Sequence, residues 1–302
     1  MSFLSSLTVT SIGLTCKAFL LSPLTNTSVN NLHILKNALS LNSRNNGQGI
    51  ITVCNHISTL DDPVTWGVLP ASYYLSSRTT RWGLGASEVM FTNPVFSAFF
   101  RLGQILETFR GQGIYQPSVD AAISKLNQGH WPTFRDSSGA CKPTYLFSVS
   151  FRLDNQFKIR SGRILMSTTQ MPVVIPMWIS GFDRLMPEGR PFPYKYLPHM
   201  GVDLSVTFGE PIDPELLKRA LLIPRDPAPS TIHNLGLEPT LGGSTTQEHL
   251  EGWSKNLDPL HDEDALRTSL IRQQLTSIVH DHVQKLGYSV SGPLLGAPPP
   301  PP

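Results

Sequence analysis

The chain has 302 residues, 40% of them hydrophobic, which is enough for the core of one large domain or two small ones. Lys and Arg total 24 and Asp and Glu total 22, so the net charge is +2 and only 15% of residues are charged. Soluble domains average roughly 25% charged residues. Wholesale disorder is therefore not expected, and a nucleic-acid partner, which needs a clustered basic face, is disfavoured. The charge deficit leaves room for a lipid-facing surface.

The cysteine and histidine spacings predict no metal and no organic cofactor. Cys16, Cys54 and Cys141 are odd in number and contain no CxxC pair, so we expect reduced thiols without a disulfide framework or a zinc site. His280 and His282 are two positions apart on an expected helix, where they point to different faces and have no third ligand nearby.

Residues 1–30 form an apolar N-terminal segment. The stretch from Phe3 to Leu21 has no acidic residue, is diluted by Ser and Thr, and is interrupted by Lys17. An uninterrupted apolar run of about 18 residues, as a spanning helix needs, is not reached. The segment is compatible with a weak targeting signal, a buried helix or an interfacial anchor, and no basic region precedes it as in a secretory signal. We expect monotopic attachment to a membrane surface.

Residues 31–220 predict a single domain of the α/β class, with a central mixed sheet flanked by helices, because expected strands alternate with expected helices. A short β-branched run at 50–54 is typical of a buried strand. An acidic pair before Pro63 is typical of a helix start. The other expected elements are helices at 31–39 and 118–126 and strands at 172–178 and 204–208.

The last third of the chain changes character twice. Residues 221–261 are rich in Pro, Gly, Ser and Thr, lack periodicity, and are interpreted as a flexible surface insertion. Residues 262–287 open with acidic residues and carry apolar residues at helical spacing, which predicts a C-terminal helix of the same domain that Gly287 ends. Residues 288–302 are interpreted as a Pro-rich tail.

His56 and Asp61 are the first candidates for chemistry. They follow an expected strand and precede an expected helix, a position where exposed catalytic groups are often held. A carboxylate can hold one ring nitrogen of a histidine and fix its tautomer, which leaves the other nitrogen to accept a hydroxyl proton. The alternative is an ordinary loop histidine beside an aspartate that merely caps a helix.

The surrounding motifs give a more specific interpretation. The string Asn55-His56-Ile57-Ser58-Thr59-Leu60-Asp61-Asp62-Pro63 resembles the first block of the glycerolipid acyltransferases, and within that family it resembles the tafazzins most closely. The resemblance continues in the same order through Trp66-Gly67, 100–103, 110–116, 125–131, 162–166 and 173–183.

The resemblance implies a CoA-independent transacylase that moves acyl chains between phosphatidylcholine-type phospholipids and monolysocardiolipin, with His56 as general base oriented by Asp61. It further implies that Arg110 binds a lipid phosphate, for which a guanidinium is suited, while Gly111 and Gly113 let the backbone approach the headgroup. Phospholipid and lysophospholipid are the implied substrates. The implied location is monotopic, on the inner and outer mitochondrial membranes facing the intermembrane space.

One block of the family pattern is missing. Phe-Pro-Glu-Gly is expected shortly after Trp131, but the sequence reads Pro132-Thr133-Phe134-Arg135-Asp136-Ser137-Ser138-Gly139. The string Pro187-Glu188-Gly189-Arg190 lies after the fourth block, so we interpret it as a coincidence. Residues 132–160 are therefore atypical, either in a divergent enzyme or through an altered exon or retained intron. Two further functions stay open: an acyl-CoA-dependent lysophospholipid acyltransferase, and a catalytically impaired membrane-bound protein that only binds lipid.

Overall fold

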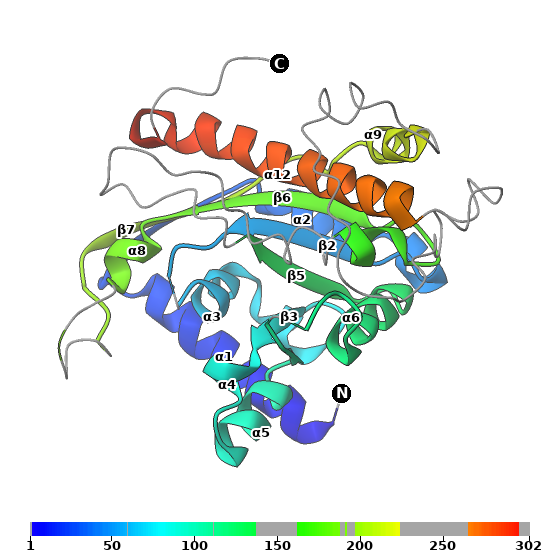
Figure 1. The fold of residues 1–302 in the computed structure, drawn as a ribbon. Coiled ribbons are helices and arrows are strands. Elements are labelled where there is room, and N and C mark those ends of the chain that lie inside the picture. Colours follow the sequence, from blue (N-terminus) through cyan, green and yellow to red (C-terminus); the bar gives the residue numbers. More distant parts are fainter. Residues whose placement is uncertain are drawn as a thin grey trace.

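The computed structural model describes residues 2–58, 60–110, 112–136, 162–187, 191, 197–223 and 265–295. A seven-stranded sheet with the order β1-β7-β6-β2-β5-β3-β4 lies at its centre, with helices on both faces (Figure 1). The strands are β1 Thr25–Asn30, β2 Ile50–Asn55, β3 Arg81–Ala86, β4 Ile105–Thr108, β5 Trp131–Asp136, β6 Val173–Ser180 and β7 Val202–Phe208.

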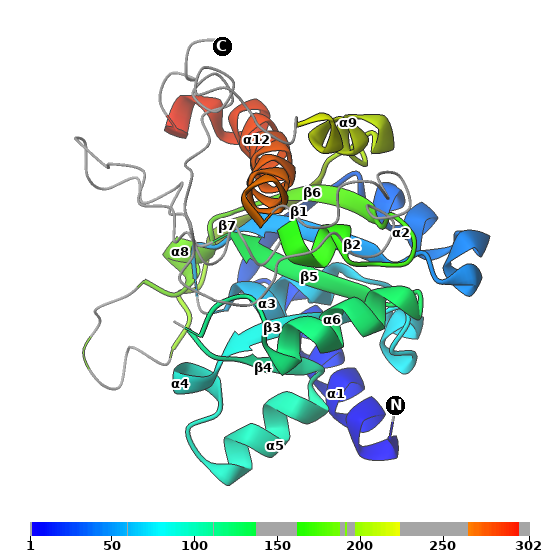
Figure 2. The ribbon, with the colours of Figure 1, turned by 45° about the vertical axis from the view of Figure 1, so that its right-hand side comes forward.

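Six of the described α-helices divide between the two faces of the sheet (Figure 2). One face is covered by α6 Pro117–Asn127, α9 Pro214–Arg219 and α12 Ala265–Leu295, and the other by α1 Phe3–Leu21, α2 Leu32–Leu39 and α3 Asp61–Thr65. The remaining α-helices are α4 Ser87–Met90, α5 Pro94–Leu102 and α8 Phe182–Leu185, and the 3-10 helices are η1 Asn42–Asn46, η2 Trp66–Val68, η3 Ala71–Leu75 and η5 Ala220–Leu222.

The central strand β2 shows why the sheet is buried on both faces. Its six residues are all buried, and their side chains alternate between two hydrophobic clusters. Ile51 and Val53 pack with α6 and α12, whereas Ile50 and Cys54 pack with α1 and α2. The mixed α/β fold expected from the sequence is therefore confirmed.

The direction of the strands decides where a site can form. Strands β6, β2, β5, β3 and β4 are mutually parallel, and β7 joins β6 in the antiparallel sense with β1 parallel to β7. The carboxyl ends of the five parallel strands therefore meet at one edge of the sheet. Open α/β sheets bind ligands at that edge.

The structure contains the expected helices and strands of the domain and also strands that the sequence did not predict. The helices expected at 31–39 and 118–126 and the strands expected at 50–54, 172–178 and 204–208 are present within two residues of their predicted bounds. Strand β1 pairs with β7, so the N-terminal segment does not end before the domain begins. Strands β1, β3, β4 and β5 were missed because they are polar, contain Gly or Pro, or are only four residues long.

The prediction that Gly287 ends the last helix is wrong, because α12 continues to Leu295. A Cβ atom at Gly287 would lie 2.5 Å from the Trp178 ring on β6, so this glycine permits close packing of helix on sheet. The expected insertion at 221–261 and the atypical stretch 132–160 lie mostly outside the described residues.

We predict that Gly287→Ala lowers the free energy of unfolding by about 1–3 kcal/mol, because the added methyl group overlaps the Trp178 ring. Gly292→Ala, just beyond the kink at Ser291 in α12, is the control, since no atom lies within 4 Å of its Cβ position. Urea denaturation of both variants measures the difference. Equal stability of the two variants would show that α12 does not pack on β6 in this way.

Candidate active site

His56 and Asp61 meet at the carboxyl end of β2. The Nδ1 atom of His56 lies 2.8 Å from Oδ2 of Asp61, and because a carboxylate only accepts, Nδ1 donates. The same Oδ2 accepts from the backbone N–H groups of Ile57 at 2.7 Å and Ser58 at 3.0 Å. The His56 side chain is 41% exposed, whereas that of Asp61 is fully buried. This geometry leaves Nε2 of His56 as the nitrogen that can accept a proton.

Asp61 does not simply cap a helix. It is the first residue of α3, and the preceding Leu60 makes no side-chain capping bond. The carboxylate instead turns back to the loop that carries His56. The structure thus favours a hydrogen-bonded dyad over the alternative in which Asp61 only caps α3.

Asn55 fixes the end of β2 on which His56 stands. Its side-chain amide donates to the carbonyl oxygen of Ile179 at 2.8 Å and accepts from the N–H group of Ile179 at 2.9 Å. These two bonds tie the ends of β2 and β6 together and leave no buried polar atom of this side chain without a partner. Asn55 is a positioning residue that the sequence reasoning did not single out.

A second, partly buried carboxylate lies beside the dyad. Asp62 accepts from the guanidinium of Arg81 on β3, and its Oδ1 lies 3.3 Å from the indole nitrogen of Trp66. Burial raises the pKa of Asp62, but the charges of Arg81 and Arg135 and the bonds from Arg81 and Trp66 outweigh it and lower the pKa to about 2. Asp62 is therefore a carboxylate throughout the physiological range.

Arg135 on β5 is the residue that occupies this edge of the sheet where the family block is missing. Its Nη1 lies 3.6 Å from Oδ2 of Asp61, and its Nη2 lies 3.6 Å from Oδ1 of Asp62. The position is set by the parallel pairing of β5 with β2, in which Arg135 is opposite Cys54. Arg135 stands in the stretch where the family block was expected, but no strand was predicted there.

The predicted phosphate-binding loop follows β4 at the same edge. Arg110 is 67% exposed and pairs with Glu88 of α4, its Nε 3.1 Å from Oε1, so it contacts this carboxylate and not the dyad. Gly113 has a positive φ of 76°, and no atom lies within 4 Å of its Cβ position. The Gln116 side chain stabilises the loop. Its amide oxygen accepts from the N–H group of Phe109, and its amide nitrogen donates to the carbonyl oxygens of Phe109 and Gly113. Gly111 lies outside the described residues.

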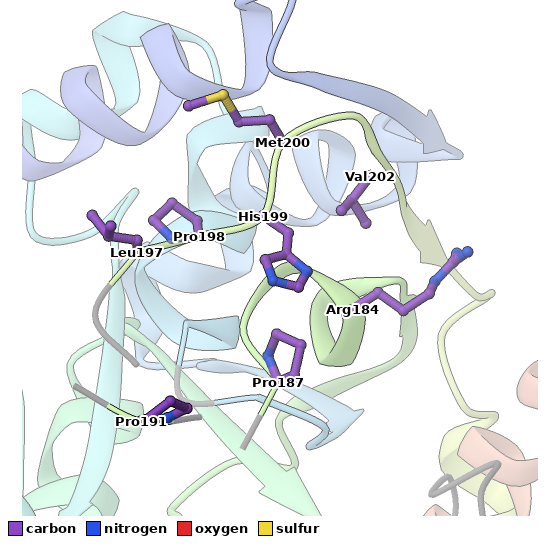
Figure 3. A pocket seen from close by; sticks show the side chains of 8 residues that line it. All are labelled: Arg184, Pro187, Pro191, Leu197, Pro198, His199, Met200 and Val202. Atoms are coloured by element: carbon purple, nitrogen blue, oxygen red, sulfur yellow. The ribbon is translucent and has the colours of Figure 1, made fainter. Parts of the chain in front are cut away.

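An apolar cavity of about 1000 Å³ lies beside α8, the helix that follows β6 (Figure 3). Arg184 and His199 line it together with six apolar residues, which are Pro187, Pro191, Leu197, Pro198, Met200 and Val202. Because β6 and β2 are adjacent and parallel, the cavity borders the same edge of the sheet as His56, although neither residue of the dyad lines it. Residues 188–190 of the Pro-Glu-Gly-Arg string lie outside the described residues.

Within the described ranges, no group of three or more His, Cys, Asp or Glu residues could hold a metal ion. The arrangement at the carboxyl edge is a partly exposed histidine whose ring is held by a buried carboxylate. Such a dyad can activate an alcohol for attack on an acyl carbonyl.

Comparison with known proteins shows the family of this chain. The family model described as Acyltransferase matches residues 30–180, which is half of the chain. The chain belongs to the acyltransferase family, and it is an acyltransferase.

Individual relatives narrow the comparison and confirm the tafazzin resemblance. The taffazin of Dictyostelium discoideum is 31% identical over 70% of this chain and 70% of its own length, and the tafazzin of Saccharomyces cerevisiae is 30% identical over 64% and 59%. The N-acylphosphatidylethanolamine synthase of Arabidopsis thaliana is 35% identical over 67% of this chain and 69% of its own length. The crystal structure of the 1-acyl-sn-glycerophosphate acyltransferase PlsC from Thermotoga maritima matches 92% of this chain and 78% of that chain, with 16% identity and a TM-score of 0.43.

We predict that His56→Ala and Asp61→Asn each reduce acyl transfer by at least about 10²-fold, because one removes the base and the other removes the charge that orients it. Asp281→Asn on α12, where the side chain is 56% exposed, is the control and keeps the wild-type rate. Initial rates with a labelled acyl donor measure the effect. Full activity of Asp61→Asn would contradict the role of the dyad.

Proposed function

We propose that this protein is a CoA-independent transacylase that moves acyl chains from phosphatidylcholine-type phospholipids to monolysocardiolipin, and so remodels cardiolipin. The observation that carries the proposal is the His56–Asp61 hydrogen bond at the carboxyl edge of the sheet. The similarity to the tafazzins of two organisms supports the choice of lipid substrates. No cofactor is needed for this reaction, since donor and acceptor are both lipids.

The proposed reaction uses one proton twice. Nε2 of His56 takes the proton of the lysolipid hydroxyl, and the oxygen attacks the ester carbonyl of the donor phospholipid. Asp61 stabilises the imidazolium that forms, because its carboxylate already accepts from Nδ1. Collapse of the tetrahedral intermediate breaks the donor ester bond, and the imidazolium returns the proton to the leaving lysophospholipid. One ester is formed and one is broken, so the step is balanced without water or CoA.

The headgroup site is proposed at the loop after β4. Arg110 is exposed and could exchange its partner Glu88 for a lipid phosphate, to which a guanidinium offers two parallel hydrogen bonds. The open space at Gly113 lets a phosphate approach the backbone. Gly111 is proposed for the same role from the motif alone. The apolar cavity beside α8 offers a surface of suitable chemistry for an acyl chain.

The relative from Arabidopsis thaliana supports a second candidate, because its name specifies an amide product formed on an amine acceptor. A histidine base can deprotonate an ammonium group as well as a hydroxyl group, so the dyad does not choose between the two acceptors. The acyl-CoA-dependent reaction and the impaired protein are the further alternatives, the latter because the third family block is missing.

We predict that the purified chain transfers a labelled acyl group from phosphatidylcholine to monolysocardiolipin in mixed vesicles without CoA, and that His56→Ala abolishes the transfer. Parallel reactions replace the acceptor by phosphatidylethanolamine or the donor by acyl-CoA. A labelled amide product would support the second candidate, and a strict need for acyl-CoA would support the CoA-dependent enzyme. No product in any reaction, with activity gained when Phe-Pro-Glu-Gly is restored, would show an impaired protein.

Membrane attachment is proposed through α1. This helix is long and apolar enough to cross a membrane by length and composition, but core helices and signal sequences share those properties. In the structure α1 packs on the domain: a Cβ at Gly13 would lie 2.7 Å from the Tyr74 ring, and one at Gly67 would lie 2.7 Å from the Cys16 backbone. A spanning α1 would lose these contacts, so we propose that it lies in the interface.

Helix α5 extends the proposed membrane-facing surface. The Ser5 hydroxyl of α1 donates to the carbonyl oxygen of Leu102 at 2.7 Å, and the two helices lie together in both views (Figures 1 and 2). Neither helix contains an acidic residue. Their exposed apolar side chains are Phe3, Leu4, Leu7, Leu14 and Leu21 on α1 and Val95, Phe96 and Phe99 on α5. We propose mitochondrial membranes facing the intermembrane space as the location, which protease protection in isolated mitochondria would test.

We predict that replacing Phe96 and Phe99 together by Asp lowers vesicle binding at least about tenfold, because two carboxylates would enter the lipid interface. Leu222→Asp is the matched control: Leu222 is also exposed, but it follows α9 on the opposite face of the sheet. Flotation with phosphatidylcholine vesicles containing cardiolipin measures binding. An equal loss in the control, or none in the α5 variant, would contradict the surface.

A further inference from the structure

The side chain of Arg135 connects the two buried carboxylates of the site. It is 12% exposed, compared with 0% for Asp61 and 19% for Asp62. Its contact on Asp61 is Oδ2, the same oxygen that accepts from His56. Arg135 therefore contacts the same carboxylate oxygen as the proposed base.

The charges around this pair sum to zero only when Arg135 is included. Asp61 and Asp62 contribute two negative charges, and Arg81 contacts Asp62 alone. Arg135 supplies the second positive charge, since a guanidinium is not deprotonated in proteins. An uncompensated buried carboxylate next to an imidazole would favour the protonated ring.

We propose that Arg135 is a positioning residue that balances the carboxylates of Asp61 and Asp62 and thereby keeps His56 neutral, and available as a base, at physiological pH. Arg135 lies outside the motif blocks in which this chain resembles the family. The proposal concerns the dyad on which the proposed function rests, but the charge balance itself does not depend on which lipid reacts.

Two buried cysteines are the other titratable groups at this place. Cys54 on β2 is opposite Arg135 in the sheet, and its Sγ lies 4.0 Å from the carbonyl oxygen of Phe134. Burial raises the pKa of the Cys16 thiol on α1, which keeps this thiol uncharged. A site for the lipid phosphate at Arg135 is disfavoured, because the two carboxylates would repel that anion.

The sign of the effect follows from the charge. Removing the positive charge of Arg135 leaves a surplus negative charge beside His56, which stabilises the imidazolium and raises the pKa of His56. A base that must be neutral then works only at higher pH, so the acidic limb of the rate profile moves upward. Removing Asp62 has the opposite sign, because a surplus positive charge then remains.

The test is an NMR titration of the His56 ring, assigned by comparison with His56→Ala, in full-length variants. We expect Arg135→Met to raise the apparent pKa of His56 by about one unit, Arg135→Lys to restore most of the wild-type value, and Arg101→Met, at an exposed ion pair, to leave it unchanged. The acidic limb of acyl transfer should move with it. The titration does not require an active enzyme. It therefore tests the charge balance even if CoA-free acyl transfer is not found.

A double variant covers the case in which Arg135→Met does not fold, as breaking a buried ion pair can cause. Arg135→Met combined with Asp62→Asn removes one charge of each sign, so the expected result is a folded protein whose His56 titrates near the wild-type value. An unchanged titration in Arg135→Met would overturn the proposal. A double variant that titrates away from the wild-type value would overturn it as well, and so would a change confined to the KM for lipid.

Discussion

The site depends on one carboxylate oxygen. Oδ2 of Asp61 accepts from the ring of His56 and from two consecutive backbone N–H groups, so a single buried atom fixes both the loop after β2 and the orientation of the imidazole. The fold supplies the constraint: β2 is buried on both faces, and Asn55 ties its end to β6. His56 can therefore be partly exposed to substrate while Asp61 is shielded from water. An electrostatic interaction is stronger in the protein interior than in water, so the shielding strengthens the contact between the two residues.

That shielding requires compensation, because two adjacent carboxylates are buried at the same place. Arg81 and Arg135 reach them from β3 and β5, strands distant from the dyad in sequence but neighbours in the sheet. The stretch that lacks the family's third block thus still contributes a residue to the site. Arg135, on which the proposed charge balance depends, thus stands in the strand where the family block is missing.

Sequence reasoning found the elements whose signal is local. The β-branched run of β2, the apolar β6 and the spacing of α6 and α12 follow from periodicity, and the pairing of His56 with Asp61 follows from their place between a strand and a helix. It missed β5 because Pro132 argues against a central strand, and Arg135 and Arg81 because their contacts depend on sheet order. Gly287 was misread as a helix end, since close packing on Trp178 cannot be read from one segment.

The tautomer of His56 tests the central claim most directly, because the proposed chemistry requires Nδ1 to carry the proton and Nε2 to be free. The ¹⁵N chemical shifts of both ring nitrogens at neutral pH, in the wild-type protein and in Asp61→Asn, report it without any assumption about substrate. We predict a protonated Nδ1 and an unprotonated Nε2 in the wild type, with that preference lost in the variant. A proton on Nε2 in the wild type, unchanged by Asp61→Asn, would contradict the account.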